Sequence, residues 1–153
     1  MTMSPTIRAV ARDDYKQWLL LWDGYNTFYG RFGATALSDR ITQMTWERFF
    51  DGYEPVHALV AEYDGKLVGL VHYLFHRSTT MYGPTCYLQD LFTDTTLRGK
   101  GIGKALILGV YDEAKRNSAD RVYWLTHETN LTAMRLYDQV APKPGFVVYR
   151  KDL

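Results

Sequence analysis

Three glycines at alternate positions, Gly99, Gly101 and Gly103, stand between a strand-like segment and an amphipathic helical segment. Glycine has no Cβ atom, so this backbone can turn tightly and approach a ligand closely. The first turn of the following helix leaves N–H groups without intrahelical partners, beside the positive end of the helix dipole. The pattern therefore predicts a strand–turn–helix unit whose natural ligand is an anionic phosphate.

The residues around the glycines narrow the kind of phosphate site. Arg98, Lys100 and Lys104 would add positive charge around the phosphate. The third glycine arrives one residue too early for the dinucleotide spacing G-x-G-x-x-G, and the motif G-x-x-x-x-G-K-[ST] is missing. From this motif alone, a glycine-rich turn without any ligand stays an alternative.

Hydrophobic periodicity predicts one mixed α/β domain. Helices are expected over residues 15–28, 38–50, 103–116 and 130–140. Strands are expected over residues 7–10, 58–63, 67–75, 86–93, 122–126 and 146–150. No internal repeat or linker interrupts the 153 residues.

Charge and cysteine content bear on partners and compartment. The formal net charge of +1 gives no electrostatic reason to expect nucleic acid or an anionic membrane as a partner. No stretch approaches the roughly 20 apolar residues of a membrane helix. The single cysteine, Cys86, cannot form an internal disulfide, which fits a reducing compartment. A cytoplasmic location is therefore expected.

Two motifs at a fixed separation carry a family resemblance. The run Arg98-Gly99-Lys100-Gly101-Ile102-Gly103 matches the R/Q-x-x-G-x-G/A signature of the GNAT acetyltransferase superfamily. The run 130–137 followed by Gly145-Phe146 resembles that family's N-x-x-A-x-x-x-Y…G-F block. Within the superfamily, residues 87–92 and 122–130 resemble the yeast histone and polyamine acetyltransferases and the spermidine/spermine acetyltransferases.

The resemblance implies a fold and a reaction. The fold would be a single GNAT-like α/β (α+β) domain over residues 1–153. Its central mixed, mostly antiparallel sheet would have about six to seven strands, flanked by about four helices. The activity would be acetyl transfer from acetyl-coenzyme A to a primary amine by direct attack on the thioester.

The resemblance also implies site residues. Main-chain groups of Leu91, Phe92 and Thr93 would pair with pantetheine, and an N–H near Leu91 would face the thioester carbonyl. The backbone of the glycine turn would hold the pyrophosphate through Arg98, Gly99, Lys100, Gly101, Ile102, Gly103 and Lys104. On the last helix, Asn130, Ala133 and Tyr137 would contact the cofactor. Tyr137 would also protonate the leaving thiolate, and Asn130 would cap that helix.

The general base stays open at this point. Spermidine/spermine enzymes carry Glu where this chain has Gln89, which cannot take a proton. Asp90 follows Gln89, so its side chain would point to the opposite face of the strand unless a β-bulge changed its direction. The candidates are Asp90, His72, His76, His127 and water. No third or fourth ligand joins His72, His76 and Cys86 at structural-zinc spacing, so no metal is expected.

The acceptor side is expected over residues 22–50, with the loop 76–84. Aromatic and acidic side chains there suit a cationic amine, and they equally suit a helix pair packed on a sheet: Trp22, Tyr25, Phe28, Tyr29, Trp46, Asp23, Glu47, Asp51 and Glu54. A small amine, such as a polyamine or amino acid, is the first expectation. A protein lysine or N-terminus, or a non-catalytic acyl-CoA-binding module, is the alternative. A homodimer is possible.

Overall fold

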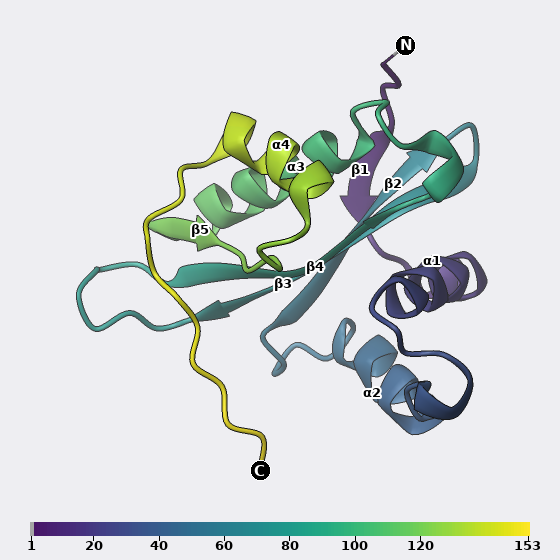
Figure 1. Ribbon diagram of the computed structural model, residues 1–153, viewed down its shortest axis with the longest axis horizontal. Helices are drawn as coiled ribbons and strands as arrows, with labels where there is room; N and C mark the ends of the chain where they lie inside the picture. The colour runs from purple at the N-terminus through teal and green to yellow at the C-terminus, as the bar shows by residue number, and fades with distance from the viewer. Residues whose placement is uncertain (1) are drawn as a thin grey trace.

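A twisted five-stranded sheet separates two helical layers in the computed structural model, which describes residues 2–153 (Figure 1). The strands lie side by side in chain order. The first four pair antiparallel, and the last pair, β4 with β5, is parallel. The strand bounds are β1 Thr6–Ala9, β2 Val56–Tyr63, β3 Lys66–His76, β4 Thr85–Thr93 and β5 Arg121–Tyr123.

Two helices cover each face of the sheet (Figure 1). Helices α1 (Tyr15–Phe28) and α2 (Asp39–Arg48) lie on one face, and α3 (Ile102–Arg116) and α4 (Leu131–Val140) lie on the other. Short 3₁₀ turns occupy Arg12–Asp14, Gly33–Thr35 and Thr95–Leu97. None of the helices formed by residues 2–153 is long and apolar enough to cross a membrane.

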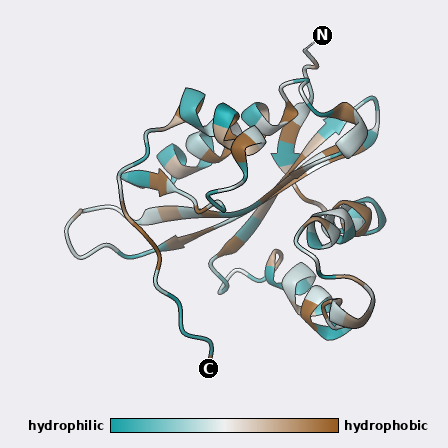
Figure 2. Cartoon of the chain, in the orientation of Figure 1, coloured by the Kyte–Doolittle hydropathy of each residue, from teal (hydrophilic) through white to brown (hydrophobic). Residues whose placement is uncertain are grey.

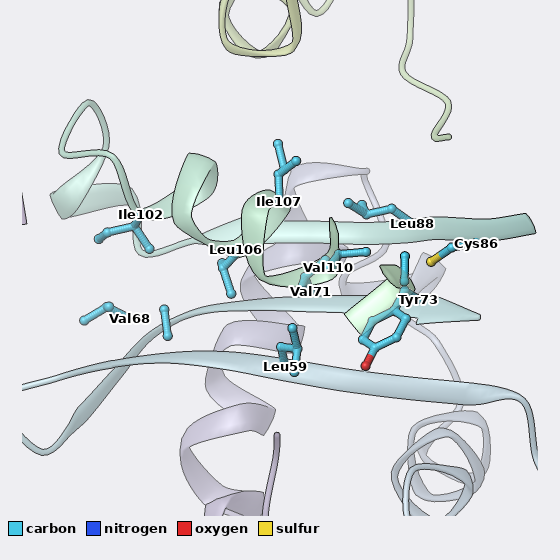
Figure 3. Packing of buried hydrophobic residues seen from close by; sticks show 12 residues of the cluster. Leu59, Val68, Val71, Tyr73, Cys86, Leu88, Ile102, Leu106, Ile107 and Val110 are labelled. Carbon is cyan, nitrogen blue, oxygen red and sulfur yellow. The ribbon is translucent and has the colours of Figure 1, made fainter. Parts of the chain in front are cut away.

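Each face of the sheet carries its own hydrophobic core. Under α3, the buried side chains of Ile102, Leu106, Ile107 and Val110 pack against strand residues such as Val71 (Figure 3). Under α1 and α2, three tryptophans dominate, Trp18, Trp22 and Trp46. These clusters fix both helical layers on the sheet, because burying such aliphatic and aromatic side chains contributes about 1.5–3 kcal/mol each.

The mixed α/β class and the four helices are confirmed, while the expected strand count is wrong. The described residues form five strands instead of six to seven. The fifth covers Arg121–Tyr123 instead of 122–126, and residues 146–150 are extended but pair with no strand. A segment with strand-like sequence forms a strand only where it can hydrogen-bond to the edge of another strand. Residues 141–153 instead lead away from the sheet (Figure 1).

Candidate active site

The segment from Arg98 to Lys104 forms an open turn that begins α3. Gly99 and Gly101 adopt left-handed φ angles of 78° and 85°, where an L side chain would be strained. Behind the turn, the N–H of Met3 donates to the carbonyl of Lys100 at 2.9 Å. Within residues 2–153, the backbone N–H groups of residues 98–104 donate no hydrogen bond. Such a row of free donors at a helix N-terminus is suited to an anion.

Strand β4 has a free edge that leads to this turn. It pairs with β5 only through residues 85–87, so residues 88–93 have no strand on that side within the described chain. The free edge includes Leu91, Phe92 and Thr93. Its N–H and C=O groups can pair with an extended ligand as another strand would.

A β-bulge in β4 decides which way its side chains point. Opposite β3, His72 pairs with Asp90 but Tyr73 pairs with Leu88, so Gln89 is the extra residue. The bulge turns Asp90 toward α1, whereas Leu91 packs with the core under α3. Asp90 could point toward the face covered by α1 only if β4 contained a bulge, and the structure contains that bulge.

Helix α4 brings Tyr137 to the same layer as Leu91. A Cβ added to Gly103 would lie 3.3 Å from Leu136 Cδ2, so α4 packs directly on the start of α3. Tyr137 packs edge-on against Trp124, with ring centroids 5.4 Å apart. Burial raises the pKa of Tyr137 to about 12, with a smaller contribution from Tyr29. Tyr137 is therefore a neutral phenol, able to donate a proton.

The start of α4 differs in detail from the expected cap. Asn130 holds the N-cap position but its side chain makes no capping hydrogen bond. Its Nδ2 instead donates to Thr126 Oγ1 at 3.4 Å. Ala133 lies one turn before Tyr137, so both are presented on one side of α4.

A buried hydrogen-bonded chain lies beneath α1. The indole N–H of Trp18 donates to His72 Nε2 at 3.0 Å, and His72 Nδ1 lies 2.9 Å from Asp90 Oδ2. The other carboxylate oxygen, Oδ1, accepts from the Tyr25 hydroxyl at 2.7 Å. An indole can only donate, so Nε2 is the acceptor and Nδ1 carries the proton that Asp90 accepts. Both ring nitrogens of His72 are occupied, which excludes it as the base.

The other two histidines considered as the base, His76 and His127, lie outside this buried hydrogen-bonded chain. His76 is exposed and bonds through both nitrogens, to the Arg77 carbonyl at 3.0 Å and the Tyr123 hydroxyl at 2.9 Å. His127 is exposed in the β5–α4 loop, with Nδ1 2.7 Å from Thr129 Oγ1. Cys86 is buried in the core under α3, and no group of three metal-ligating side chains occurs within residues 2–153.

Most of the expected acceptor residues lie either in the core or on the surface. Trp22, Tyr25 and Trp46 are core, whereas Phe28 and Tyr29 are exposed. Glu47 pairs with Arg12, and Glu54 pairs with Arg48. Asp51 accepts from the backbone N–H of Tyr53.

A cleft of about 520 Å³ opens between α1, the following loop and α2. Its walls carry two carboxylates, Asp23 and Asp39, together with the guanidinium of Arg31. Desolvation, and then the charge of Asp39, raise the pKa of Asp23. A cation in the cleft would relieve that repulsion.

Comparison with known proteins decides the family. Residues 18–141 match the Acetyltransferase (GNAT) family. The D-amino-acid N-acetyltransferase HPA3 of Saccharomyces cerevisiae is 30% identical over 149 residues, which are 95% of this chain and 89% of that protein. The chain belongs to the GNAT acetyltransferase family. It is an N-acetyltransferase, and the resemblance seen in the two motifs is confirmed.

Other similar proteins match a smaller part of the chain or match it at lower sequence identity. The L-ornithine N5-acetyltransferase NATA1 of Arabidopsis thaliana is 33% identical over 54 residues, 35% of this chain and 24% of that protein. The structure of a ribosomal-protein-alanine N-acetyltransferase from Brucella melitensis superposes with a TM-score of 0.78 at 21% identity, covering 98% of this chain and 99% of the other. AAC(6')-Iy in complex with a bisubstrate analog gives 0.78 at 15% identity, with coverage of 99% and 100%. These two structures support the fold.

Sequence reasoning did not foresee two partners in this GNAT site. Trp18 and Tyr25 follow helical spacing, which marked them as apolar-face residues but gave no sign of a carboxylate beneath. The influence of Tyr29, which follows α1, on the pKa of Tyr137 was not foreseen either.

Proposed function

We propose that this N-acetyltransferase moves the acetyl group of acetyl-coenzyme A to the primary amine of a small molecule, a polyamine or an amino acid. The observation that carries the proposal is a pair of backbone stretches close in sequence, the open edge of β4 at residues 88–93 and the free N–H groups of the glycine turn at residues 98–104. Coenzyme A has amide groups followed by a pyrophosphate, which is the order of partners that these stretches offer. Leu91, Phe92 and Thr93 would take the amides, and Arg98, Lys100 and Lys104 would surround the phosphates.

Acetyl-coenzyme A, when bound, supplies an acetyl thioester. The N–H of Leu91 would donate to the carbonyl oxygen of that thioester as negative charge develops there, a contribution of about 3 kcal/mol. Tyr137 would give its proton to the departing sulfur.

The acceptor nitrogen must lose a proton before it attacks. Asp90 presents a carboxylate with one hydrogen bond at each oxygen, and 13% of its side chain is exposed. A carboxylate retains further lone pairs, so Asp90 would hold the incoming ammonium. With both nitrogens of His72 occupied, water would carry the proton to the solvent.

The cleft between α1 and α2 supports a small charged acceptor. Its carboxylates, Asp23 and Asp39, favour a second amino group, as in a diamine. Arg31 lines the same cleft and would pair with the carboxylate of an amino acid. Two relatives are named for acting on D-amino acids and on L-ornithine, which supports an amino acid as the acceptor.

Incubation with acetyl-coenzyme A and a panel of amines tests the function. The panel contains D- and L-amino acids, ornithine, polyamines and a lysine-rich peptide, with thiol release and product mass as readouts. Acetylation of a free amino acid or polyamine supports the proposal. Acetylation of the peptide alone would overturn the small-amine assignment and favour a protein acceptor.

The proposal also covers the domain organisation, the location and the assembly of the protein. Residues 1–153 would constitute a single acetyltransferase domain. The cytoplasmic location is supported by the lone, buried Cys86, which suits a reducing compartment. A homodimer is supported by exposed apolar residues near the C-terminus, which a second copy would cover.

A further inference from the structure

Arg31, which lies just beyond the end of α1, is held in a fixed orientation by a buried asparagine. Its Nε donates to Oδ1 of Asn26 at 2.7 Å, and its backbone N–H donates to the Asn26 carbonyl at 2.8 Å. Asn26 is only 5% exposed. Its Nδ2 donates to the Trp22 carbonyl at 2.9 Å, so the amide turns Oδ1 toward Arg31, which can only donate. Asn26 therefore sets the direction of the Arg31 side chain.

The guanidinium of Arg31 is also packed against two aromatic rings. It lies 5.7 Å from the ring centroid of Tyr25 and 5.4 Å from that of Tyr29. Such cation–π contacts restrict a side chain that otherwise has many rotamers. Nε is bonded to Asn26, and neither terminal nitrogen of Arg31 has a hydrogen-bond or ion-pair partner among residues 2–153. The guanidinium therefore keeps the donors of both terminal nitrogens for a ligand.

The cleft between α1 and α2 indicates which kind of anion Arg31 can take. Arg31 lines this cleft together with Asp23 and Asp39, and no ion pair joins it to either carboxylate within the described residues. Figure 2 shows hydrophilic residues on both helices that wall the cleft. The two carboxylates repel phosphate or a dicarboxylic acid, whereas an ammonium group on the same molecule offsets that repulsion. A carboxylate carried by an amino acid therefore matches the cleft.

Tyr25 connects Arg31 with the carboxylate that the proposed mechanism places beside the amine. The guanidinium lies over the Tyr25 ring, and the Tyr25 hydroxyl donates to Asp90 Oδ1 at 2.7 Å. One tyrosine side chain thus separates a group suited to a carboxylate from a group suited to an ammonium. A free amino acid carries both charges within a few bonds, so one molecule can engage both groups.

We propose that Arg31 is the specificity-determining residue of this N-acetyltransferase, and that it selects acceptors with a free carboxylate. Asn26 is the positioning residue that keeps the guanidinium in the orientation this requires. A planar guanidinium binds a carboxylate through two parallel hydrogen bonds, which neither a carboxamide nor a bare amine can form. The inference rests on the proposed function, because it concerns the small acceptor of the same site. It narrows that acceptor from a polyamine or an amino acid to an amino acid.

Acetyl transfer to matched acceptors tests the selection. One series is ornithine, ornithinamide and 1,4-diaminobutane, and another is phenylalanine, phenylalaninamide and phenethylamine, with chiral members in both enantiomeric forms. Within a series only the carboxyl position changes. The amino acid should exceed the other members in kcat/KM by about tenfold or more, the worth of hydrogen bonds to a charged group. Equal or higher kcat/KM for the members without a carboxylate would overturn the inference and leave small-amine transfer standing. No transfer to any member of either series would overturn both.

Variants test the two residues through the ratio of kcat/KM for the amino acid to that for its amide. In Arg31→Gln this ratio should fall to about one, through a higher KM for the amino acid alone. Asn26→Ala keeps the guanidinium but no longer orients it, so the ratio should fall about fivefold with kcat nearly unchanged. Arg40→Gln changes an exposed residue of α2 that does not line the cleft, and should keep the wild-type ratio.

The ratio separates recognition from stability, because a general loss of folded protein changes the rates for both acceptors alike. A wild-type ratio in Arg31→Gln would overturn the proposal. A wild-type ratio in Asn26→Ala would remove Asn26 from it.

Discussion

Nδ1 of His72 lies 2.9 Å from Oδ2 of Asp90, in a site where the histidine is almost fully buried. The indole N–H of Trp18 fixes the histidine tautomer from the other side. His72 therefore holds Asp90 in place as a positioning residue, and it has no nitrogen left for the acceptor amine. A bulge in β4, a tryptophan of α1 and a histidine of β3 together fix one carboxylate on the side of the sheet that α1 covers.

Replacing His72 by Phe should destabilise the protein. The change leaves the Trp18 N–H without an acceptor and removes one donor from Asp90, and each unsatisfied buried group costs about 1–3 kcal/mol. We expect the free energy of unfolding, measured in urea, to fall by about 3 kcal/mol. His57→Phe is the matched control, because His57 stacks on Tyr73 at 5.2 Å without a side-chain hydrogen bond in the described chain. An equal fall in the free energy of unfolding in both variants would show that the hydrogen bonds of His72 contribute nothing to stability.

Asp90→Asn should weaken acceptor binding selectively. The amide removes the negative charge that the proposed mechanism places beside the ammonium, so KM for the amine should rise about tenfold or more. The dissociation constant for coenzyme A should stay the same, since the free edge of β4 and the glycine turn are unchanged. Asp112→Asn, on the exposed side of α3, serves as the control. An unchanged amine KM in Asp90→Asn would remove Asp90 from the acceptor site.

Gly101→Ala should damage coenzyme A binding. The φ angle of 85° is strained by about 1–2 kcal/mol for any L side chain, and the added Cβ would lie 3.2 Å from Thr2 Cγ2. We expect calorimetric titration to show coenzyme A affinity reduced by about tenfold. Gly52→Ala, where φ is ordinary and no atom lies within 4 Å of the new Cβ, should bind as the wild type does. Wild-type affinity in Gly101→Ala would contradict the phosphate-site assignment.

Stability should fall at alkaline pH. Burial raises the pKa of Tyr137 and of Cys86 to about 12, above their ordinary values. Between the ordinary and the raised pKa, the unfolded chain loses protons that the folded chain keeps, so rising pH favours unfolding. The free energy of unfolding should be level from about pH 7 to 8.5 and then decline toward about pH 11. In Tyr137→Phe the decline should be shallower; an identical slope would contradict the assigned pKa.

Much of the fold could be predicted from local patterns. The glycine turn and the helix after it depend on neighbouring residues, and the structure places them as expected. The run from Asn130 to Tyr137 likewise identified α4. These features can be predicted from the sequence because backbone conformation and helical periodicity depend on neighbouring residues.

Long-range features could not be predicted in this way. The bulge at Gln89 reverses the direction of Asp90, and only the pairing of β4 with β3 reveals it. The strand predicted at residues 146–150 has the right composition, but it pairs with no strand of the described chain. Strand propensity says that a segment can pair, whereas the neighbouring edge decides whether it does.

The most direct test of the account is the turnover of Tyr137→Phe, measured as thiol release from acetyl-coenzyme A with an amine that the wild type acetylates. In the proposed mechanism the phenol gives its proton to the leaving sulfur, so kcat should fall about a hundredfold while coenzyme A affinity stays within about twofold. Tyr111→Phe, which removes only a hydroxyl bonded to the Val140 carbonyl, should retain its turnover. Full turnover in Tyr137→Phe would contradict the assignment of the acid and with it the proposed mechanism.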